Sequence, residues 1–294
     1  MLVRISSSAV LALLSVLALH TADTSQGADR PTRFSVAVVG QGPNVILIPG
    51  LATPGDVWDA TVKNLAPTHR VHVVQVAGFG GVDAGANKAG GDMLPALVAE
   101  MVQYVAGLER PAVIGHSLGG LIALEVAAQK PDVISRVLVV DALPFFALTI
   151  SPGATSDMAK QMATMMRNQL TAQTDAQYAA SAPMTAARLA KSATGRVSVT
   201  KWTAASDRAI VGKAMYEDMV TDARPQLPQI KAKTTVLYAF DSTMGLPQAM
   251  IDSLYSGAYS GLVGVDLKRI DGSYHFIMLD QPDAFSREVE AFLK

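Results

Sequence analysis

The stretch PAVIGHSLGGLIALEVAAQ, residues 111–129, joins a short apolar run, a glycine-rich turn and a helical pattern in direct succession. The run at 111–115 predicts a buried strand, and the pattern at 118–129 predicts a helix. The motif GHSLG lies between them, at 115–119. A serine on such a strand–turn–helix junction projects its hydroxyl above a sheet, beside a helix N-terminus that favours developing negative charge. Ser117 is therefore a candidate nucleophile.

Outward from this stretch, further apolar runs end in turn-forming residues and alternate with helical patterns. The predicted strands are Phe34–Val39, Val45–Ile48, Val71–Val76, Val137–Val140, Thr234–Phe240 and Val265–Ile270, and a closing helix is predicted at Ala284–Leu293. Short buried strands separated by helices predict an α/β fold with a mostly parallel sheet flanked by helices. Residues 144–228 carry helical patterns instead, so a helical segment is expected between the core segments 28–143 and 229–294.

The beginning of the chain has the three-part pattern of a secretory signal peptide. Arg4 precedes an apolar run at 9–19, and polar residues follow. The run is short for a membrane span, which needs about 20 apolar residues. We expect residues 1–27 to be a signal peptide, with the cleavage position left open. The mature chain is then expected to be periplasmic or secreted, with no stable membrane insertion.

Composition excludes several classes of protein. Of the 294 residues, 50% are hydrophobic, which is enough to build a core. Lys and Arg number 24 against 25 Asp and Glu, so no overall basic field attracts nucleic acid. Cysteine is absent, which excludes thiolate metal sites and cysteine nucleophiles. Because no ligand-like cluster occurs among the five histidines, we expect neither a metal nor another cofactor.

A serine nucleophile needs a base and an acid that orients the base. His275 is the only histidine after Ser117, and it follows the last predicted strand. Asp141 and Asp241 each end a predicted strand, and either could reach His275. We favour Asp241, because its strand is adjacent in sequence to the strand before His275, and consecutive strands are usually neighbours.

An oxyanion hole needs two backbone N–H groups. The residue after the nucleophile, Leu118, supplies one of them. The other is expected from the loop that follows the strand Val45–Ile48. Because Pro49 has no N–H, Leu51 is the candidate in this loop.

These features together resemble the α/β-hydrolase superfamily, in particular its bacterial esterase-like members with a helical cap. The resemblance covers roughly residues 34–294. The matching segments are VILIPG with Trp58, VAGFGG, VIGHSLGG, VLVVDALP and YHFIMLDQPDAF. Two positions depart from the family pattern: Pro49-Gly50 replaces a common His-Gly, and the segment before Asp241 lacks a common glycine. The family places its acid after the strand that precedes Asp241 here.

The resemblance implies a serine hydrolase that cleaves carboxyl esters of small to medium apolar molecules through an acyl-enzyme, and it makes the helical segment 144–228 a cap over the acyl pocket. The candidate lining residues are Trp58, Phe79, Met162, Met166, Trp202 and Tyr274. The methionines at 158, 162, 165 and 166 share one helical face, which indicates either ordinary core packing or a pliable apolar lining.

Other readings stay open at this point. The same residues can serve a lactonase, thioesterase, perhydrolase or carbon–carbon hydrolase, because fold and triad do not fix the substrate. A catalytically inactive ligand-binding protein on the same fold is another alternative. A dinucleotide-binding oxidoreductase is disfavoured, since Gly78-Phe79-Gly80 is followed by Asp83 where the fingerprint needs glycine.

Overall fold

A computed structural model describes residues 31–294. The expected signal peptide, residues 1–27, lies outside the described residues and stays a prediction. Within the described part of the chain, no helix combines the length and the apolar character needed to cross a bilayer.

Seven strands form one sheet in the order β1-β3-β2-β4-β5-β6-β7. The strands are β1 (Phe34–Val39), β2 (Asn44–Ile48), β3 (Arg70–Val76), β4 (Ala112–His116), β5 (Arg136–Val140), β6 (Lys233–Phe240) and β7 (Asp266–Asp271). Every neighbouring pair is parallel except β1 and β3, which are antiparallel. Each predicted strand is present to within one residue at either end, so the prediction of a mostly parallel α/β sheet is confirmed.

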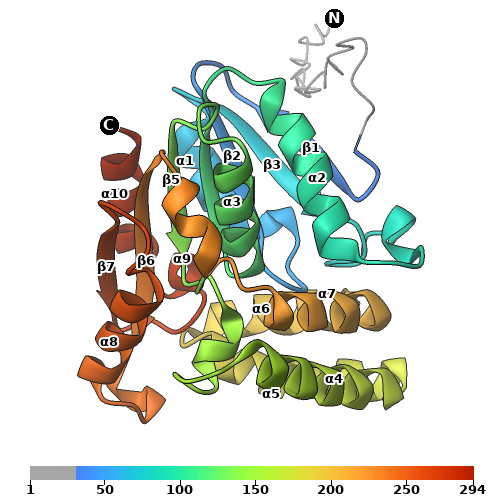
Figure 1. Ribbon diagram of the computed structural model, residues 1–294. Helices are drawn as coiled ribbons and strands as arrows, with labels where there is room; N and C mark the ends of the chain where they lie inside the picture. Colours follow the sequence, from blue (N-terminus) through green and yellow to red (C-terminus); the bar gives the residue numbers. More distant parts are fainter. Residues whose placement is uncertain (1–30) are drawn as a thin grey trace, which may run out of the picture.

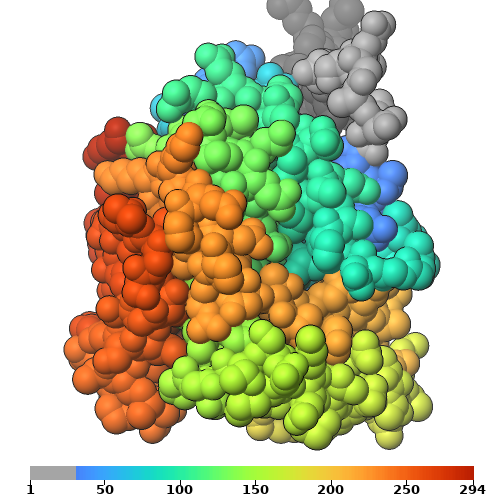
Figure 2. All heavy atoms as spheres, viewed as in Figure 1, coloured from blue at the N-terminus to red at the C-terminus, as the bar shows by residue number. Residues whose placement is uncertain are grey.

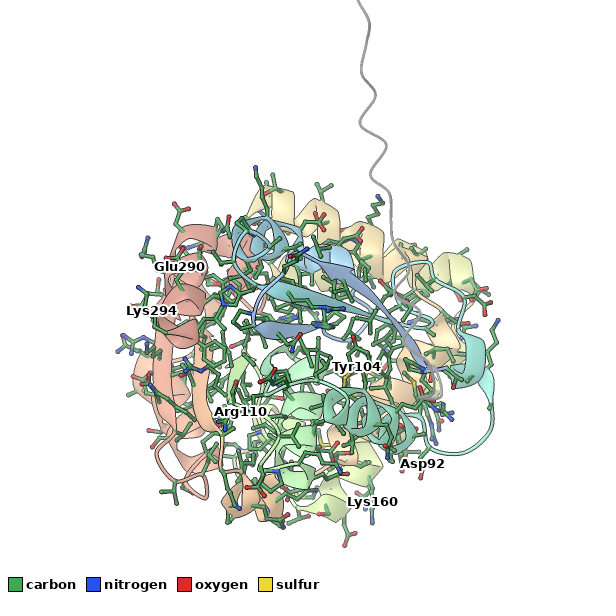
Figure 3. The ribbon with its side chains drawn as sticks, turned by 90° about the horizontal axis from the view of Figure 1, so that it is seen from above. Asp92, Tyr104, Arg110, Lys160, Glu290 and Lys294 are labelled. Atoms are coloured by element: carbon green, nitrogen blue, oxygen red, sulfur yellow. The ribbon has the colours of Figure 1, made fainter. Side chains whose placement is uncertain are left out.

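Two hydrophobic clusters cover the two faces of the sheet, because successive side chains of a strand point to opposite faces. In β4, Val113 belongs to the first cluster, whereas Ala112 and Ile114 belong to the second. Helices α2 (Met93–Ala106), α3 (Leu118–Gln129) and α8 (Gln248–Ala258) pack on the first face. The second face is covered by α1 (Asp59–Leu65), α9 (Ile277–Asp280) and α10 (Pro282–Leu293). Figure 3 shows α2 with Tyr104 and α10 with Glu290 on different sides of the strands.

Four helices are inserted between β5 and β6, and they form the lower layer in Figures 1 and 2. They are α4 (Ser156–Ala172), α5 (Asp175–Leu189), α6 (Ala193–Ala205) and α7 (Arg208–Val220). Short 3-10 helices complete the fold: η1 (Gly55–Trp58), η2 (Gly85–Lys88), η3 (Phe146–Thr149), η4 (Arg224–Gln229) and η5 (Ser242–Met244). We call α4–α7 the cap. It lies across the end of the sheet where the parallel strands finish.

Two carboxylates attach the cap to the core by accepting hydrogen bonds from backbone N–H groups. Glu217 of α7 accepts hydrogen bonds from the backbone N–H groups of Met93 and Leu94, which open α2. These N–H groups have no partner within their own helix, so the carboxylate caps α2. At the other side, Asp280 accepts from the backbone N–H groups of Lys191 and Ser192, between α5 and α6.

Candidate active site

Ser117 occupies a strained turn between β4 and α3. Its φ of 54° and ψ of −123° are unusual for a residue with a side chain. Gly115 and Gly119 make this turn possible. A Cβ atom on Gly115 would lie 2.1 Å from the carbonyl oxygen of Gly119, and one on Gly119 would lie 2.3 Å from that of Ile48. Both glycines of the motif are therefore required by close backbone approach.

Replacing Gly119 with alanine is expected to lower the free energy of unfolding by about 1–3 kcal/mol, because the added methyl group collides with the backbone at the end of β2. Gly153→Ala is the matched control, since no atom lies within 4 Å of a Cβ atom there. Urea unfolding of both variants measures the difference. Equal stabilities would contradict the explanation of the motif given above.

His275 follows β7 and forms a hydrogen bond with Asp141, at the end of β5. The distance from His275 Nδ1 to Asp141 Oδ2 is 2.7 Å. The other carboxylate oxygen of Asp141 accepts from the backbone N–H of Ala239 at 2.8 Å and from the hydroxyl of Tyr255 at 2.9 Å. Burial, reinforced by the charge of Asp141, raises the pKa of Tyr255 well above its ordinary value, so this hydroxyl remains a donor. Three donors therefore fix the carboxylate beside the imidazole.

The prediction that Asp241 orients His275 is wrong in this structure. Asp241 instead pairs with Lys191 of the cap and accepts hydrogen bonds from Thr243. The hydrogen bond from Lys191 is the largest of the effects that lower the pKa of Asp241 to about 2. Both aspartates do end adjacent parallel strands, as expected. Asp141, however, lies on the strand next to β4 and has a φ of 48°, and its side chain reaches His275.

His116, inside the motif, supports His275 from behind. Its Nε2 donates to the backbone carbonyl of His275 at 3.1 Å, and the two rings lie 4.5 Å apart between centroids. Complete burial is the main effect that lowers the pKa of His116 well below its ordinary value. The neutral ring therefore packs against His275 and holds the backbone of that residue.

The loop expected to supply the second oxyanion donor lies against the nucleophile. A Cβ atom on Gly50 would lie 3.0 Å from the Cβ atom of Ser117, so only glycine permits this approach. The next residue is Leu51, whose N–H donates to no residue in the described part of the chain. Leu118 is the first residue of α3, where backbone N–H groups lack intrahelical acceptors. The two expected donors thus lie on segments that meet at Ser117.

A cavity of about 90 Å³ joins these groups beneath the cap. Its lining residues are Ser117, Asp141, Ala142, Leu143, Phe146, Thr149, Asp218, Tyr255 and His275. Ser117, Asp141 and His275 therefore line one cavity, although they lie far apart in the sequence. Among the described residues, no group of His, Asp and Glu side chains is arranged to hold a metal ion.

None of the predicted lining residues is in the wall of the smaller cavity. Trp58 is fully buried and stacks on Phe285, and Phe79 is also fully buried in the core. Met166 is 38% exposed and Met162 is half-buried on the same helix, α4, whose buried residues are alanines. Tyr274 forms a hydrogen bond with the hydroxyl of Thr243 at 2.7 Å. The core-packing reading of the methionine face is wrong, because α4 packs through Ala159 and Ala163 instead, whereas the reading as an apolar lining stays a prediction.

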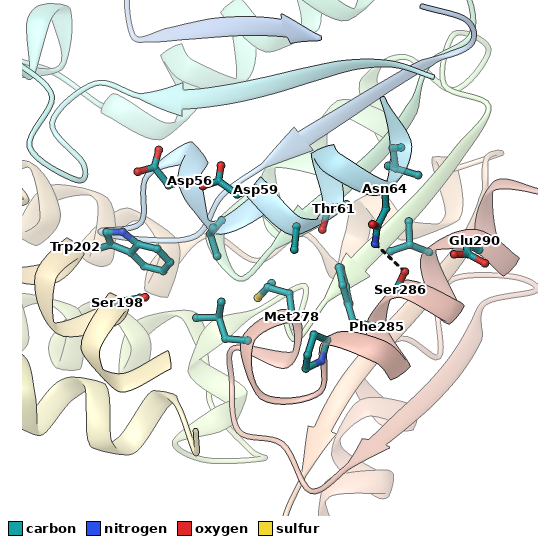
Figure 4. Close-up of a pocket in the computed structure, with 16 residues that line it drawn as sticks. Asp56, Asp59, Thr61, Asn64, Ser198, Trp202, Met278, Phe285, Ser286 and Glu290 are labelled. Atoms are coloured by element: carbon teal, nitrogen blue, oxygen red, sulfur yellow. Dashed lines mark hydrogen bonds between the residues drawn. The ribbon is translucent and has the colours of Figure 1, made fainter. Parts of the chain in front are cut away.

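Trp202 lines a separate, larger cavity of about 340 Å³, shown in Figure 4. This cavity lies between α1, α6 and α10, and Asp56, Met278 and Phe285 contribute to its walls. Its lining does not include Ser117, Asp141 or His275. The larger cavity is therefore not where the candidate nucleophile acts.

Several residues that build the smaller cavity were not predicted from the sequence. Tyr255, which binds Asp141, belongs to α8, a helix for which no prediction was made. Phe146 and Thr149 belong to η3, which directly follows Asp141 in DALPFFALT. Asp218 had the clearest signal, because Glu217 and Asp218 interrupt the apolar pattern set by Met215 and Met219.

Comparisons with known proteins identify the family of the chain. The sequence model of the alpha/beta hydrolase family matches residues 45–288. A pimeloyl-[acyl-carrier protein] methyl ester esterase of Vibrio campbellii is 38% identical over 108 residues, which cover 37% of this chain and 40% of that protein. The same enzyme of Edwardsiella ictaluri is 31% identical over 128 residues, 42% of this chain and 46% of that protein. The chain thus matches less than half the length of either relative.

Solved structures show the fold over nearly the whole chain. The enol-lactonase of Burkholderia xenovorans LB400 is 18% identical with a TM-score of 0.71, and the match covers 89% of this chain and 96% of that one. An esterase of Exiguobacterium antarcticum is 16% identical with a TM-score of 0.72, over 89% and 95% of the two chains. At such identities the likeness concerns the fold alone. Because the family match spans most of the sequence, and the strand order and serine turn agree with it, this chain belongs to the alpha/beta hydrolase family.

Proposed function

We propose that this protein is a serine hydrolase that cleaves carboxyl esters of small to medium, mainly apolar molecules. The observation that carries the proposal is the convergence of Ser117, His275 and Asp141 on one cavity, with Asp141 hydrogen-bonded to His275. The curated relatives are named as methyl ester esterases, which supports an ester as substrate. Because the match covers less than half of those proteins, their acyl substrate is not carried over.

In the proposed reaction, the hydroxyl oxygen of Ser117 attacks the ester carbonyl carbon, and Nε2 of His275 takes the hydroxyl proton. The 2.7 Å hydrogen bond to Asp141 keeps the proton of the imidazole on Nδ1, which leaves Nε2 free to accept. The same bond stabilises the imidazolium that forms. The strained turn keeps the serine hydroxyl at the edge of the cavity throughout.

Negative charge then develops on the former carbonyl oxygen. The backbone N–H groups of Leu118 and Leu51 receive it, and the N-terminus of α3 adds a favourable field. His275 returns its proton to the departing alkoxide, which leaves as the alcohol with an acyl group on Ser117. Water, deprotonated by His275, attacks this acyl-enzyme and releases the carboxylic acid.

A series of p-nitrophenyl esters with acyl chains of increasing length tests the proposed substrate class. We expect kcat/KM to rise by about fourfold per methylene while the chain fills the apolar wall of the cavity, since each buried methylene contributes about 0.8 kcal/mol. The rise should end at short to medium chains, because the cavity measures only about 90 Å³. Release of p-nitrophenol by purified protein, corrected for spontaneous hydrolysis, measures this.

Two results would contradict the proposal. One is turnover that increases steadily up to long-chain esters, which do not fit in a cavity of about 90 Å³. The other is the absence of both ester turnover and covalent labelling by a fluorophosphonate probe in well-folded protein, which would favour a catalytically inactive binding protein.

A further inference from the structure

Asp218 places a carboxyl group in the cavity, and the proposed mechanism does not use it. The residue lies on α7, is 8% exposed and lines the same 90 Å³ cavity as Ser117 and His275. No described residue donates a hydrogen bond to this carboxyl group. Its neighbour Glu217 is also buried, but accepts two hydrogen bonds from the start of α2. Asp218 thus carries unused hydrogen-bonding capacity aimed at the substrate space.

An unused buried carboxyl group is unfavourable for the empty protein. Removing a polar group from water without providing a partner is unfavourable, whereas a matching partner restores most of this loss. A ligand that brings a hydrogen-bonding group to Asp218 therefore gains more than an apolar ligand of the same shape. This difference is the physical basis of specificity at such sites.

The charges around Asp218 restrict which group fits. Burial is the main effect that raises the pKa of Asp218 to about 7; Glu125 of α3 raises it further and the charge of His275 lowers it. Asp141 and Tyr255 are the other ionisable residues that line the cavity, and the lining contains no Lys or Arg. The lining therefore offers no permanent cation to bind a carboxylate of the substrate, and the imidazole of His275 is already hydrogen-bonded to Asp141.

A hydroxyl group and an ammonium group on the substrate differ in the number of hydrogen-bond partners that they need. An ammonium group has three donors to satisfy, and part of the wall consists of the apolar side chains of Ala142, Leu143 and Phe146. A hydroxyl group has one donor and can also accept. It can donate to Asp218 when the carboxyl group is ionised and accept from it when the carboxyl group is protonated.

We propose that Asp218 determines specificity by binding a hydroxyl group on the acyl part of the ester, so that the substrates are small hydroxyacyl esters. This inference rests on the proposed esterase function and makes its substrate class narrower. Thr149 also lines the cavity, but its hydroxyl already donates to the carbonyl of Phe146 at 2.8 Å. Among the polar side chains of the wall that take no part in the proposed mechanism, Asp218 is therefore the one without a hydrogen-bond partner in the described part of the chain.

The experiment compares ethyl esters of butanoic acids that carry a methyl, a hydroxyl or an ammonium group at the same carbon, either position 3 or position 4. The methyl and hydroxyl compounds have nearly the same shape, so their ratio of kcat/KM isolates the hydrogen bond. We expect the hydroxyl ester to be preferred by a factor on the order of ten to a hundred at one of the two positions. The rate with the methyl ester reports the esterase activity itself, independently of this preference.

Three variants identify the residue responsible. Asp218→Leu should remove the hydroxyl preference, and Asp218→Asn should retain part of it, because an amide both donates and accepts. Thr149→Val is the control and should leave the ratio unchanged. All three are compared by thermal unfolding, and the wild-type ratio tests the proposal even where a variant fails to fold.

Each other outcome overturns the inference. Equal rates for the methyl and hydroxyl esters in the wild type, or a preference that survives Asp218→Leu, would show that Asp218 does not select a hydroxyl group. Faster turnover of the ammonium ester, growing as pH rises through about 7 where Asp218 ionises, would replace the hydroxyl group by a cation. Failure of every ester, together with no labelling by a fluorophosphonate, would instead reject the esterase function.

Discussion

Replacing Ser117 with alanine is expected to reduce kcat/KM for p-nitrophenyl esters by a factor on the order of 10⁴–10⁶, because the acyl-enzyme can no longer form. Labelling by a fluorophosphonate should disappear together with turnover. Stopped-time assays at high protein concentration measure the residual rate, and mass spectrometry measures the label.

Ser260→Ala provides the matched control, since this serine is exposed and its hydroxyl donates only to the nearby carbonyl of Gly257. Thermal unfolding of both variants separates lost chemistry from lost structure. If Ser117→Ala keeps more than about a tenth of the wild-type activity, the nucleophile lies elsewhere and the proposed mechanism is wrong.

The second large effect concerns the acid. Asp141→Asn is expected to lower kcat by a factor on the order of 10⁴, because an amide no longer favours the Nδ1 proton or the charged imidazole of His275. The amide also alters the hydrogen bonds with Ala239 and Tyr255. Steady-state kinetics at saturating ester measure the loss in kcat.

Asp241→Asn is the matched comparison, because the two aspartates end neighbouring strands and differ in their partners. This variant removes the ion pair with Lys191 and should leave kcat close to that of the wild type. Its effect should appear in unfolding experiments, since the pair joins the cap to the core. A crippled Asp241→Asn beside an active Asp141→Asn would reverse the assignment drawn from the structure.

Much of the sheet could be predicted because its central strands are buried on both faces. Continuous apolar runs such as Val137–Val140 have few other stable placements, and the helix Leu118–Gln129 was predicted with its observed ends. Helix α2 received no prediction, although it supplies much of one core face. An apolar composition indicates that a segment is buried. It does not indicate which other element the segment packs against.

The identity of the acid depended on information that the sequence does not carry locally. The strands β6 and β7 are neighbours, as assumed, but β5 is likewise next to β4, so both aspartates end strands that are adjacent to one carrying another site residue. Two features of the folded chain distinguish Asp141 from Asp241. The backbone at Asp141 has a positive φ, and the side chain of Asp241 is paired with Lys191 of the cap. The missing glycine before Asp241 was a signal in the right direction.

The methionine face shows a different reason for error. Spacing identified a helix over Met158–Met166, and α4 is indeed present. The spacing of apolar residues shows which face of a helix they share. It does not show whether that face contacts another helix or solvent. Met165 is 65% exposed, whereas the small residues Ala159 and Ala163 are fully buried against neighbouring helices. The small alanine side chains allow α4 to pack closely against its neighbours, so they occupy the buried face.

The attachment of α7 to α2 through Glu217 has a kinetic consequence. Lifting α7 breaks two hydrogen bonds to a carboxylate, which contribute about 1.5–3 kcal/mol each, and uncovers the first turn of α2. We therefore expect motions that lift α7 away from α2 to be rare excursions of the folded protein. For molecules too bulky to enter without such a motion, the frequency of the motion would limit the rate of association. Bulky molecules would then be disfavoured before they contact Ser117.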